Sequence, residues 1–291
     1  MTPNSLFSDI LLPVSLEDFA NSYFYRKPLH LEGNAGRYSF LPHRDELERL
    51  IVSATDRRAV FGGLKKASIK AQDCKDMFDA GATICLTGLE NGDNRLSELI
   101  ESAKESLSYS GQVSVRGYWS PRGSGFDVHY DPRVATTLQL WGEKQWWYTS
   151  TPPVDLPLGN SPYPLSDSLM MQIADGEVCT AILKPGDMLC LPPGVWHWAR
   201  ASGDGDDCFA LNLAFDYLNG GIGDIVAAAL RRRMNSFSKY RNPLFSSKGT
   251  DEFEADEAIR GLSESCRDAA LFLNDLAESQ QRLSALWREC I

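Results

Sequence analysis

Two short segments of the chain carry the residues whose types and spacing predict chemistry. They are Gly125-Phe-Asp-Val-His-Tyr-Asp131 and Leu191-Pro-Pro-Gly-Val-Trp-His197, and they hold two of the four histidines. Because side chains alternate along a β-strand, we expect His129 and Asp131 on one strand face, with His197 reaching the same point from a second strand. Two imidazoles and one carboxylate on one side of a metal ion leave its opposite side open, which is the arrangement of non-haem Fe(II) oxygenases.

One ambiguity lies within the first segment. Asp127 falls on the same predicted strand face as His129 and Asp131, so either carboxylate could bind the metal. Asp131 is the preferred ligand because it follows the histidine, the usual order of such a triad. A lone His-x-Asp is common, and His197 between two tryptophans could be a core residue, so it is the combination that predicts a metal site. His30 and His43 lie in a helix-rich region and are expected to be structural.

The elements that must position these residues change character along the chain. Residues 1–110 are predicted to be mostly helical, with Ser15 as a helix N-cap and residues 83–86 as a short strand. Residues 112–217 show short runs rich in Val, Thr, Trp, Leu and Tyr between Gly and Pro, which is typical of strands and turns. Residues 136–141 and 144–149, joined by Gly142 and Glu143, are predicted to form a β-hairpin. Residues 184–187 form a second turn, and residues 209–215 a final strand.

This pattern predicts an α+β fold class with a mainly β core. The core is a double-stranded β-helix of the jelly-roll or cupin type, with an N-terminal helical region and a C-terminal helical appendage. The predicted division is an oxygenase domain at residues 1–216 and a helical region at 217–291. In the second region, a mostly apolar stripe recurs at alternating steps of four and three, the spacing of a seam between helices. Its positions are Ala255, Ile259, Leu262, Cys266, Ala269, Leu273, Leu276, Gln280, Leu283 and Trp287. We expect a homodimer through this region; the alternative is a helix lying on the barrel.

The amino-acid composition limits the kinds of partner and the cellular location that we expect for this protein. The chain has 29 basic and 39 acidic residues, a net charge of −10, which argues against a nucleic-acid partner. No apolar run approaches the ~20 residues that span a bilayer, and no signal peptide is evident, so no membrane partner is expected. Seven cysteines without a Cys-x-x-Cys pair indicate reduced thiols. We therefore expect a cytoplasmic protein.

Ordered motifs over residues 110–216 resemble the JmjC-domain 2-oxoglutarate oxygenases. They are His129-Tyr-Asp131, Leu138-Gln-Leu, Gly142-Glu-Lys144-x-Trp146 and Leu183-Lys-Pro-Gly-Asp187-x4-Pro192-x4-His197. The most similar branch is the ribosomal oxygenases, cupin-like hydroxylases of ribosomal proteins. The residues after Phe215 are enough for the dimerisation helices of that branch but not for its winged-helix domain as well. Residues 19–29 resemble the opening helix of that branch more weakly.

The resemblance implies a function and a set of roles. Fe(II) would be held by His129, Asp131 and His197, with 2-oxoglutarate and O2 as co-substrates. Lys144 would bind the distal carboxylate of 2-oxoglutarate, and a buried cation does need an anionic partner. Tyr118 and Asn212 would also contact the co-substrate. The implied reaction is hydroxylation of an amino-acid side chain in a peptide or protein, with release of succinate and CO2.

Several alternatives stay open. The same chemistry could serve a JmjC-type demethylase or a small-molecule hydroxylase. A cupin metalloenzyme that does not use 2-oxoglutarate would leave Lys144 without a purpose. A non-catalytic binding module is disfavoured by the intact triad together with Lys144.

Overall fold

The computed structural model describes residues 5–63, 66–205, 207–216, 222–241 and 252–290. The chain divides into two compact units, residues 1–217 and residues 218–291, which are treated separately. Among the described residues, no helix combines the length and apolar character needed to cross a membrane.

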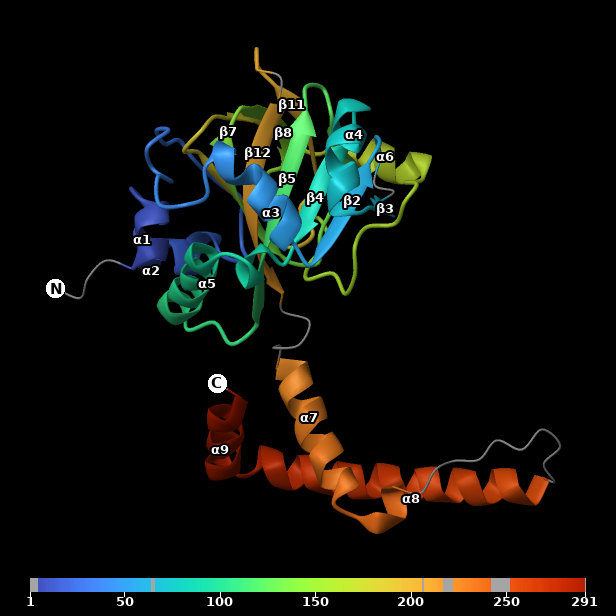
Figure 1. The fold of residues 1–291 in the computed structure, drawn as a ribbon. Coiled ribbons are helices and arrows are strands. Elements are labelled where there is room, and N and C mark those ends of the chain that lie inside the picture. The colour runs from blue at the N-terminus through green and yellow to red at the C-terminus, as the bar shows by residue number, and fades with distance from the viewer. Residues whose placement is uncertain (1–4, 64–65, 206, 217–221, 242–251, 291) are drawn as a thin grey trace. The chain divides into compact units, whose positions relative to one another are not determined.

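Two antiparallel sheets form the core of the first unit (Figure 1). The larger sheet has the order β1-β10-β7-β12-β5-β4-β2-β3, and the smaller has the order β6-β11-β8-β9. The larger sheet contains β1 (Leu29–Leu31), β2 (Asp56–Val60), β3 (Lys66–Ser68), β4 (Thr83–Thr87), β5 (Gln112–Pro121), β7 (Val134–Trp141), β10 (Met188–Leu191) and β12 (Asp207–Asp216). The smaller contains β6 (Gly125–His129), β8 (Glu143–Thr149), β9 (Val178–Leu183) and β11 (His197–Ser202). The predicted double-stranded β-helix is confirmed.

The two faces of the larger sheet serve different purposes because side chains alternate along each strand. On β5 and β12, odd-numbered residues such as Val115, Trp119 and Leu211 pack in the main hydrophobic core with residues from the helices. Even-numbered residues, including Tyr118 and Asn212, line a chamber on the opposite face. The strands therefore hold an apolar layer outside the barrel and a polar interior within it.

The predicted hairpin at residues 136–149 is wrong. β7 pairs with β10 and β12 in the larger sheet, whereas β8 pairs with β11 and β9 in the smaller. Gly142, at φ +65°, turns the chain from one sheet to the other. A tight Gly-containing turn looks the same locally in both cases, and long-range pairing decides between them.

The helices of the first unit lie mainly before the barrel strands in the sequence. They are α1 (Leu6–Leu11), α2 (Leu16–Asp18), α3 (Leu47–Ser53), α4 (Cys74–Asp79) and α5 (Asn94–Leu107), with α6 (Asp167–Asp175) following β8. Ser15 caps α2 by accepting a hydrogen bond from the Asp18 amide, as predicted. α4 packs on β2, β4 and β5 (Figure 1). Residues 1–110 are less helical than predicted, because β1, β2 and β3 extend the edges of the large sheet in addition to the predicted β4.

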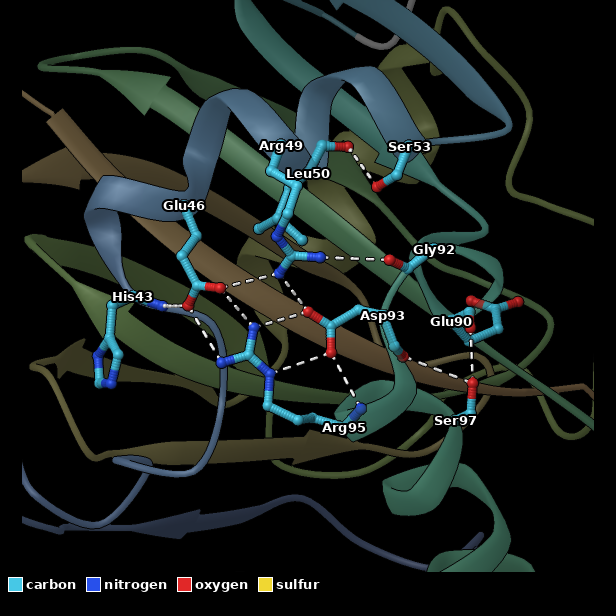
Figure 2. A network of polar contacts seen from close by, with 10 residues as sticks. All are labelled: His43, Glu46, Arg49, Leu50, Ser53, Glu90, Gly92, Asp93, Arg95 and Ser97. Atoms are coloured by element: carbon cyan, nitrogen blue, oxygen red, sulfur yellow. Dashed lines mark hydrogen bonds and ion pairs between the residues drawn. The ribbon is translucent and has the colours of Figure 1, made fainter.

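A polar network joins α3 to the N-terminus of α5 (Figure 2). Asp93 caps α5 by accepting from the Arg95 amide at 3.0 Å, and its carboxylate also pairs with the Arg95 and Arg49 guanidinium groups. Glu46 accepts from the same two arginines, at 2.7 Å from Arg95 and 3.0 Å from Arg49. Burial alone would raise the pKa of Asp93, but hydrogen bonds from Arg95 and Arg49 lower it to about 2. Those from Arg95 and the His43 amide likewise lower the pKa of Glu46 to about 2.

The second unit consists of α7 (Ile222–Asn235), a short 3₁₀ turn (Ser238–Arg241), α8 (Glu252–Ala277) and α9 (Gln280–Cys290). α7, α8 and α9 contact one another within the unit. The long apolar stripe predicted from the sequence is not on one continuous helix, since α8 ends at Ala277 and α9 begins at Gln280. The side chains of Ala255, Ile259 and Trp287 in that stripe lie outside the part of the structure that is described.

Candidate metal centre

His129, Asp131 and His197 lie close together. Each offers a ligand atom, and these three atoms are all within 4.8 Å of one another. His129 ends β6 and His197 begins β11, and the two residues stand opposite each other across this strand pair. Their ring centroids are 4.3 Å apart. The small sheet thus supplies both imidazoles from adjacent strands.

Asp131 reaches the site differently from the prediction. β6 ends at His129, so Asp131 lies in the loop that follows and not on the strand. Its backbone carbonyl accepts a hydrogen bond from the Gly194 amide at 3.0 Å, which ties this loop to the Pro-Pro-Gly turn before His197. The turn therefore positions two ligands, the carboxylate and the second imidazole.

The hydrogen bonds of the imidazoles leave the correct nitrogen available for a metal. Nδ1 of His129 lies 2.7 Å from the Asp127 carbonyl oxygen, and Nδ1 of His197 lies 2.9 Å from the Val195 carbonyl oxygen. A carbonyl can only accept, so each Nδ1 carries the proton and donates it. Each Nε2 of a neutral ring then presents a lone pair, as a metal ligand requires. The donor set fits a divalent transition metal with open positions.

Asp127 does not join this group. Its carboxylate pairs with Arg200, and its contribution to the centre is the backbone carbonyl that orients His129. His30 and His43 also lie outside the group; His30 is 3.9 Å from Asp187, and His43 caps the turn before α3.

The surroundings of the centre favour the protonation states in which Asp131 and His197 can bind a metal. Burial opposes ionisation of Asp131, but His129, His197, Arg133 and Arg116 outweigh it, and the net result is a lowered pKa for this carboxyl group. Burial, assisted by His129, lowers the pKa of His197 to about 4. At neutral pH the site therefore offers a carboxylate and a neutral buried imidazole.

Beside the three ligands opens a chamber of about 380 Å³ whose lining includes Lys144, Tyr118 and Asn212. Lys144 is 2% exposed, and its ammonium donates to the Ser120 hydroxyl at 3.2 Å and lies 6.0 Å from the Tyr118 ring centroid. Among the described residues, no carboxylate lies within ion-pair distance of this ammonium group. A buried cation held only by a hydroxyl and a ring is suited to an anionic ligand.

The other two sequence-predicted contacts also face this chamber. Asn212 donates to the Thr137 hydroxyl at 3.1 Å, so its side chain is fixed by the neighbouring strand. Burial raises the pKa of Tyr118 to about 12, which keeps the phenol neutral and able to donate a hydrogen bond. The structure therefore places all six sequence-predicted site residues around one chamber.

Several residues at the site were not anticipated from the sequence. Ser120 and Arg116 share the inward face of β5 with Tyr118, and strand alternation from Tyr118 could have indicated both. Arg133 and Tyr163 also line the chamber, but they belong to irregular segments with no periodic signal. Trp119 and Trp141, which flank the site in sequence, instead donate their indole N–H groups to Asp207 at 2.7 and 3.1 Å.

An apolar groove adjoins the chamber. It is lined by residues of α6, β6 and β11 together with Tyr163, which also lines the chamber. Met170, Ile173 and Trp198 are among its lining residues. Tyr163 therefore lies between the chamber and an apolar surface.

Comparison with known proteins gives a consistent set of similarities. Residues 89–220 match the family model of the JmjC domain. The chain is 24% identical over 292 residues to the Bacillus subtilis protein YxbC, covering 90% of this chain and 85% of that protein. It is 27% identical over 217 residues to ribosomal oxygenase 2 of Rattus norvegicus, covering 68% of this chain and 44% of the relative. The chain thus spans less than half the length of that ribosomal oxygenase.

Solved structures of Escherichia coli YcfD share the fold. The X-ray structure of YcfD superposes with a TM-score of 0.60 at 18% identity, covering 94% of this chain and 70% of that one. A structure described as the ribosomal oxygenase YcfD in complex with cobalt and 2-oxoglutarate gives a TM-score of 0.60 at 16% identity, covering 96% of this chain and 71% of the other.

Proposed function

The chain contains a JmjC domain and is homologous to the ribosomal oxygenases, and from this premise we propose that it is an Fe(II)- and 2-oxoglutarate-dependent oxygenase. Its product is a hydroxylated side chain of a peptide or protein. The observation that carries the proposal is the convergence of His129, Asp131 and His197 beside a chamber that holds the buried ammonium of Lys144.

His129, Asp131 and His197 would hold the iron. Two neutral nitrogens and one carboxylate oxygen suit Fe(II) and leave coordination positions for co-substrates. When bound, Fe(II) supplies the activation of dioxygen that couples oxidation of 2-oxoglutarate to succinate and CO2 with hydroxylation of a substrate C–H bond. The backbone carbonyls of Asp127 and Val195 keep both imidazoles in the binding tautomer.

Lys144 would bind the distal carboxylate of 2-oxoglutarate. Ser120 orients the ammonium, and the neutral phenol of Tyr118 and the amide of Asn212 offer further polar contacts on the same chamber wall. Such a charge-assisted contact contributes roughly 1.5–3 kcal/mol. Because Lys144 is buried, water competes poorly for the ammonium group.

A peptide or protein substrate is supported by two observations. The relatives include ribosomal oxygenases and a protein named bifunctional lysine-specific demethylase and histidyl-hydroxylase NO66 of Dictyostelium discoideum. The apolar groove that shares Tyr163 with the chamber can take residues flanking a target side chain. A small-molecule substrate would leave this groove without a use, and a cupin enzyme without 2-oxoglutarate would leave Lys144 without a ligand.

The experiment that tests the proposal is a screen for hydroxylated products. The purified full chain is incubated with Fe(II), ascorbate, 2-oxoglutarate and candidate peptides or cell extract. Mass spectrometry should find products heavier by one oxygen atom, and succinate should form in proportion. Formaldehyde release from methyl-lysine peptides would favour demethylation instead, and product formation without added 2-oxoglutarate would contradict the proposal.

We also propose that the protein forms a homodimer through its second unit and resides in the cytoplasm. Leu262 and Leu271 on α8 are 56% and 68% exposed, which supports an apolar surface covered by a second copy. Six cysteines among the described residues are free thiols, which supports a reducing compartment.

A further inference from the structure

The chamber carries more positive charge than 2-oxoglutarate requires. Its described lining contains four cationic side chains, Arg58, Arg116, Arg133 and Lys144, and one carboxylate, Asp131. Arg58 is exposed and pairs with Asp56 at 2.6 Å, so its charge is already matched. Lys144 is assigned to the co-substrate. Arg116 hydrogen-bonds with Tyr118, and both Arg116 and Arg133 favour the ionised form of Asp131, but each of the two arginines keeps a donor that these contacts do not use.

Arg116 lies away from the Lys144 end of the chamber, and Arg133 lies close in sequence to the metal-ligand candidate Asp131. Arg116 precedes Ser120, the hydroxyl that holds Lys144, by four residues on β5, roughly 13 Å along an extended strand. Arg133 follows the metal-ligand candidate Asp131 by two residues. A distal carboxylate bound at Lys144 therefore lies at the opposite end of this strand segment from Arg116.

Both arginines have an unused donor. Their Nε atoms are buried and have no hydrogen-bond partner among the described residues. Buried polar groups are normally paired, so these donors indicate an acceptor that arrives with a ligand. A guanidinium group presents its donors as a planar fork that matches a carboxylate. In a chain of net charge −10, such a pair beside the metal-ligand candidates selects for an anionic group.

We propose that Arg116 and Arg133 bind the carboxylate of an aspartyl or glutamyl side chain, and that this acidic residue is the one hydroxylated. The inference rests on the oxygenase function proposed above. A C–H bond of the residue becomes C–OH; one oxygen atom of O2 enters the product, the other enters succinate, and CO2 leaves 2-oxoglutarate. The relative named a histidyl-hydroxylase acts on a different side chain, so this pair would set the specificity of the present chain.

Peptide libraries with random flanks and one fixed central residue test the assignment. The Fe(II)-loaded full chain is given libraries with central Asp or Glu, central Asn or Gln, and central His, and tandem mass spectrometry locates the added oxygen. We expect modification of the acidic residue, with the Asn and Gln libraries modified roughly 10- to 100-fold less.

Variants then assign the preference to the two residues. Arg116→Gln and Arg133→Gln should each lose this discrimination while keeping the wild-type Kd for 2-oxoglutarate, measured in the absence of peptide. Arg116→Lys and Arg133→Lys keep the charge without the fork and should retain part of the preference. Arg122→Gln, which changes an exposed arginine outside the chamber lining, should keep the wild-type preference. Thermal unfolding checks that each variant folds.

Three results would overturn the inference. They are equal or greater modification of the amide or His libraries, a weakened 2-oxoglutarate Kd in the Arg116 and Arg133 variants, and wild-type protein that binds 2-oxoglutarate but modifies none of the libraries. Failure of the oxygenase proposal is distinguishable, because wild-type protein would then not bind 2-oxoglutarate at all.

Discussion

The imidazole rings of His129 and His197, on the adjacent strands β6 and β11, are oriented by the same kind of hydrogen bond. In each residue, Nδ1 donates to the backbone carbonyl two positions earlier, Asp127 at 2.7 Å and Val195 at 2.9 Å, and the two rings are 4.3 Å apart. The main chain, which substitutions leave in place, therefore sets the tautomer of both rings. A substitution at Asp127 can therefore remove its carboxylate while keeping the backbone carbonyl that orients His129.

The first prediction distinguishes the roles of the Asp127 and Asp131 carboxylates in metal binding. Asp131→Asn and His197→Ala should each weaken Fe(II) binding by more than roughly 100-fold, because loss of even an outer-shell partner typically costs 10–100-fold. Asp127→Asn is the matched control, since it keeps the carbonyl that orients His129. Metal content after dialysis measures the effect. Loss of metal from the Asp127 variant with retention in the Asp131 variant would reverse the assignment.

The second prediction concerns pH. Burial lowers the pKa of His197 from 6.5 to about 4, so between these values the unfolded state binds more protons at this position than the folded state. The free energy of unfolding of the metal-free protein should therefore decrease as pH falls through this window. Urea unfolding of wild type and His197→Asn at several pH values in this window measures the contribution. Identical pH slopes for the two proteins would contradict it.

A third prediction concerns a more acidic window. The pKa of Asp93 falls from 3.8 to about 2 and that of Glu46 from 4.5 to about 2, so the stability they contribute is present above about pH 4.5 and is lost as pH falls toward 2. Asp93→Asn keeps an N-cap but loses the ion pairs with Arg95 and Arg49, and should cost roughly 1–3 kcal/mol at neutral pH. Its unfolding free energy should then change less with acid than that of wild type. An unchanged acid response would refute the role of this network.

A fourth prediction tests the proposed dimer. Leu262→Glu combined with Leu271→Glu places charge on an exposed part of α8 and should leave the fold of the unit intact. Light scattering after size exclusion should change from a dimer mass to a monomer mass of 32.3 kDa. Arg231→Glu, at an exposed position of α7, serves as the control. A dimer that survives the double substitution would exclude this surface of α8.

Much of the site could be predicted from local sequence. Strand alternation and the Pro-Pro-Gly turn were sufficient to bring His129 and His197 to one point, and an apolar run predicted the final strand, whereas Asn212 was implied by the family resemblance. The jelly-roll architecture followed from short apolar strands punctuated by Gly and Pro. These signals are local, and local rules of backbone geometry carry them.

What could not be predicted depends on contacts between distant residues. Gly142 makes a turn that fits a hairpin equally well, and only the pairing of β8 with β11 and β9 shows that the chain changes sheets. β1, β2 and β3 are short strands at the edges of the large sheet. β2 contains Arg57 and Arg58, so it lacks the apolar alternation by which a strand is predicted from sequence. Strand alternation could place Ser120 on the inward face of β5, but its contact with Lys144 joins two distant segments and depends on the folded structure.

The central claim is that Lys144 binds 2-oxoglutarate beside a metal held by His129, Asp131 and His197. The most direct test is an anaerobic titration of the Fe(II)-loaded protein with 2-oxoglutarate, comparing wild type, Lys144→Met and the exposed-lysine control Lys184→Met. We expect Lys144→Met to keep its Fe(II) and to bind 2-oxoglutarate roughly 10- to 100-fold more weakly, with Lys184→Met unchanged. Equal 2-oxoglutarate affinity in all three proteins would contradict the account.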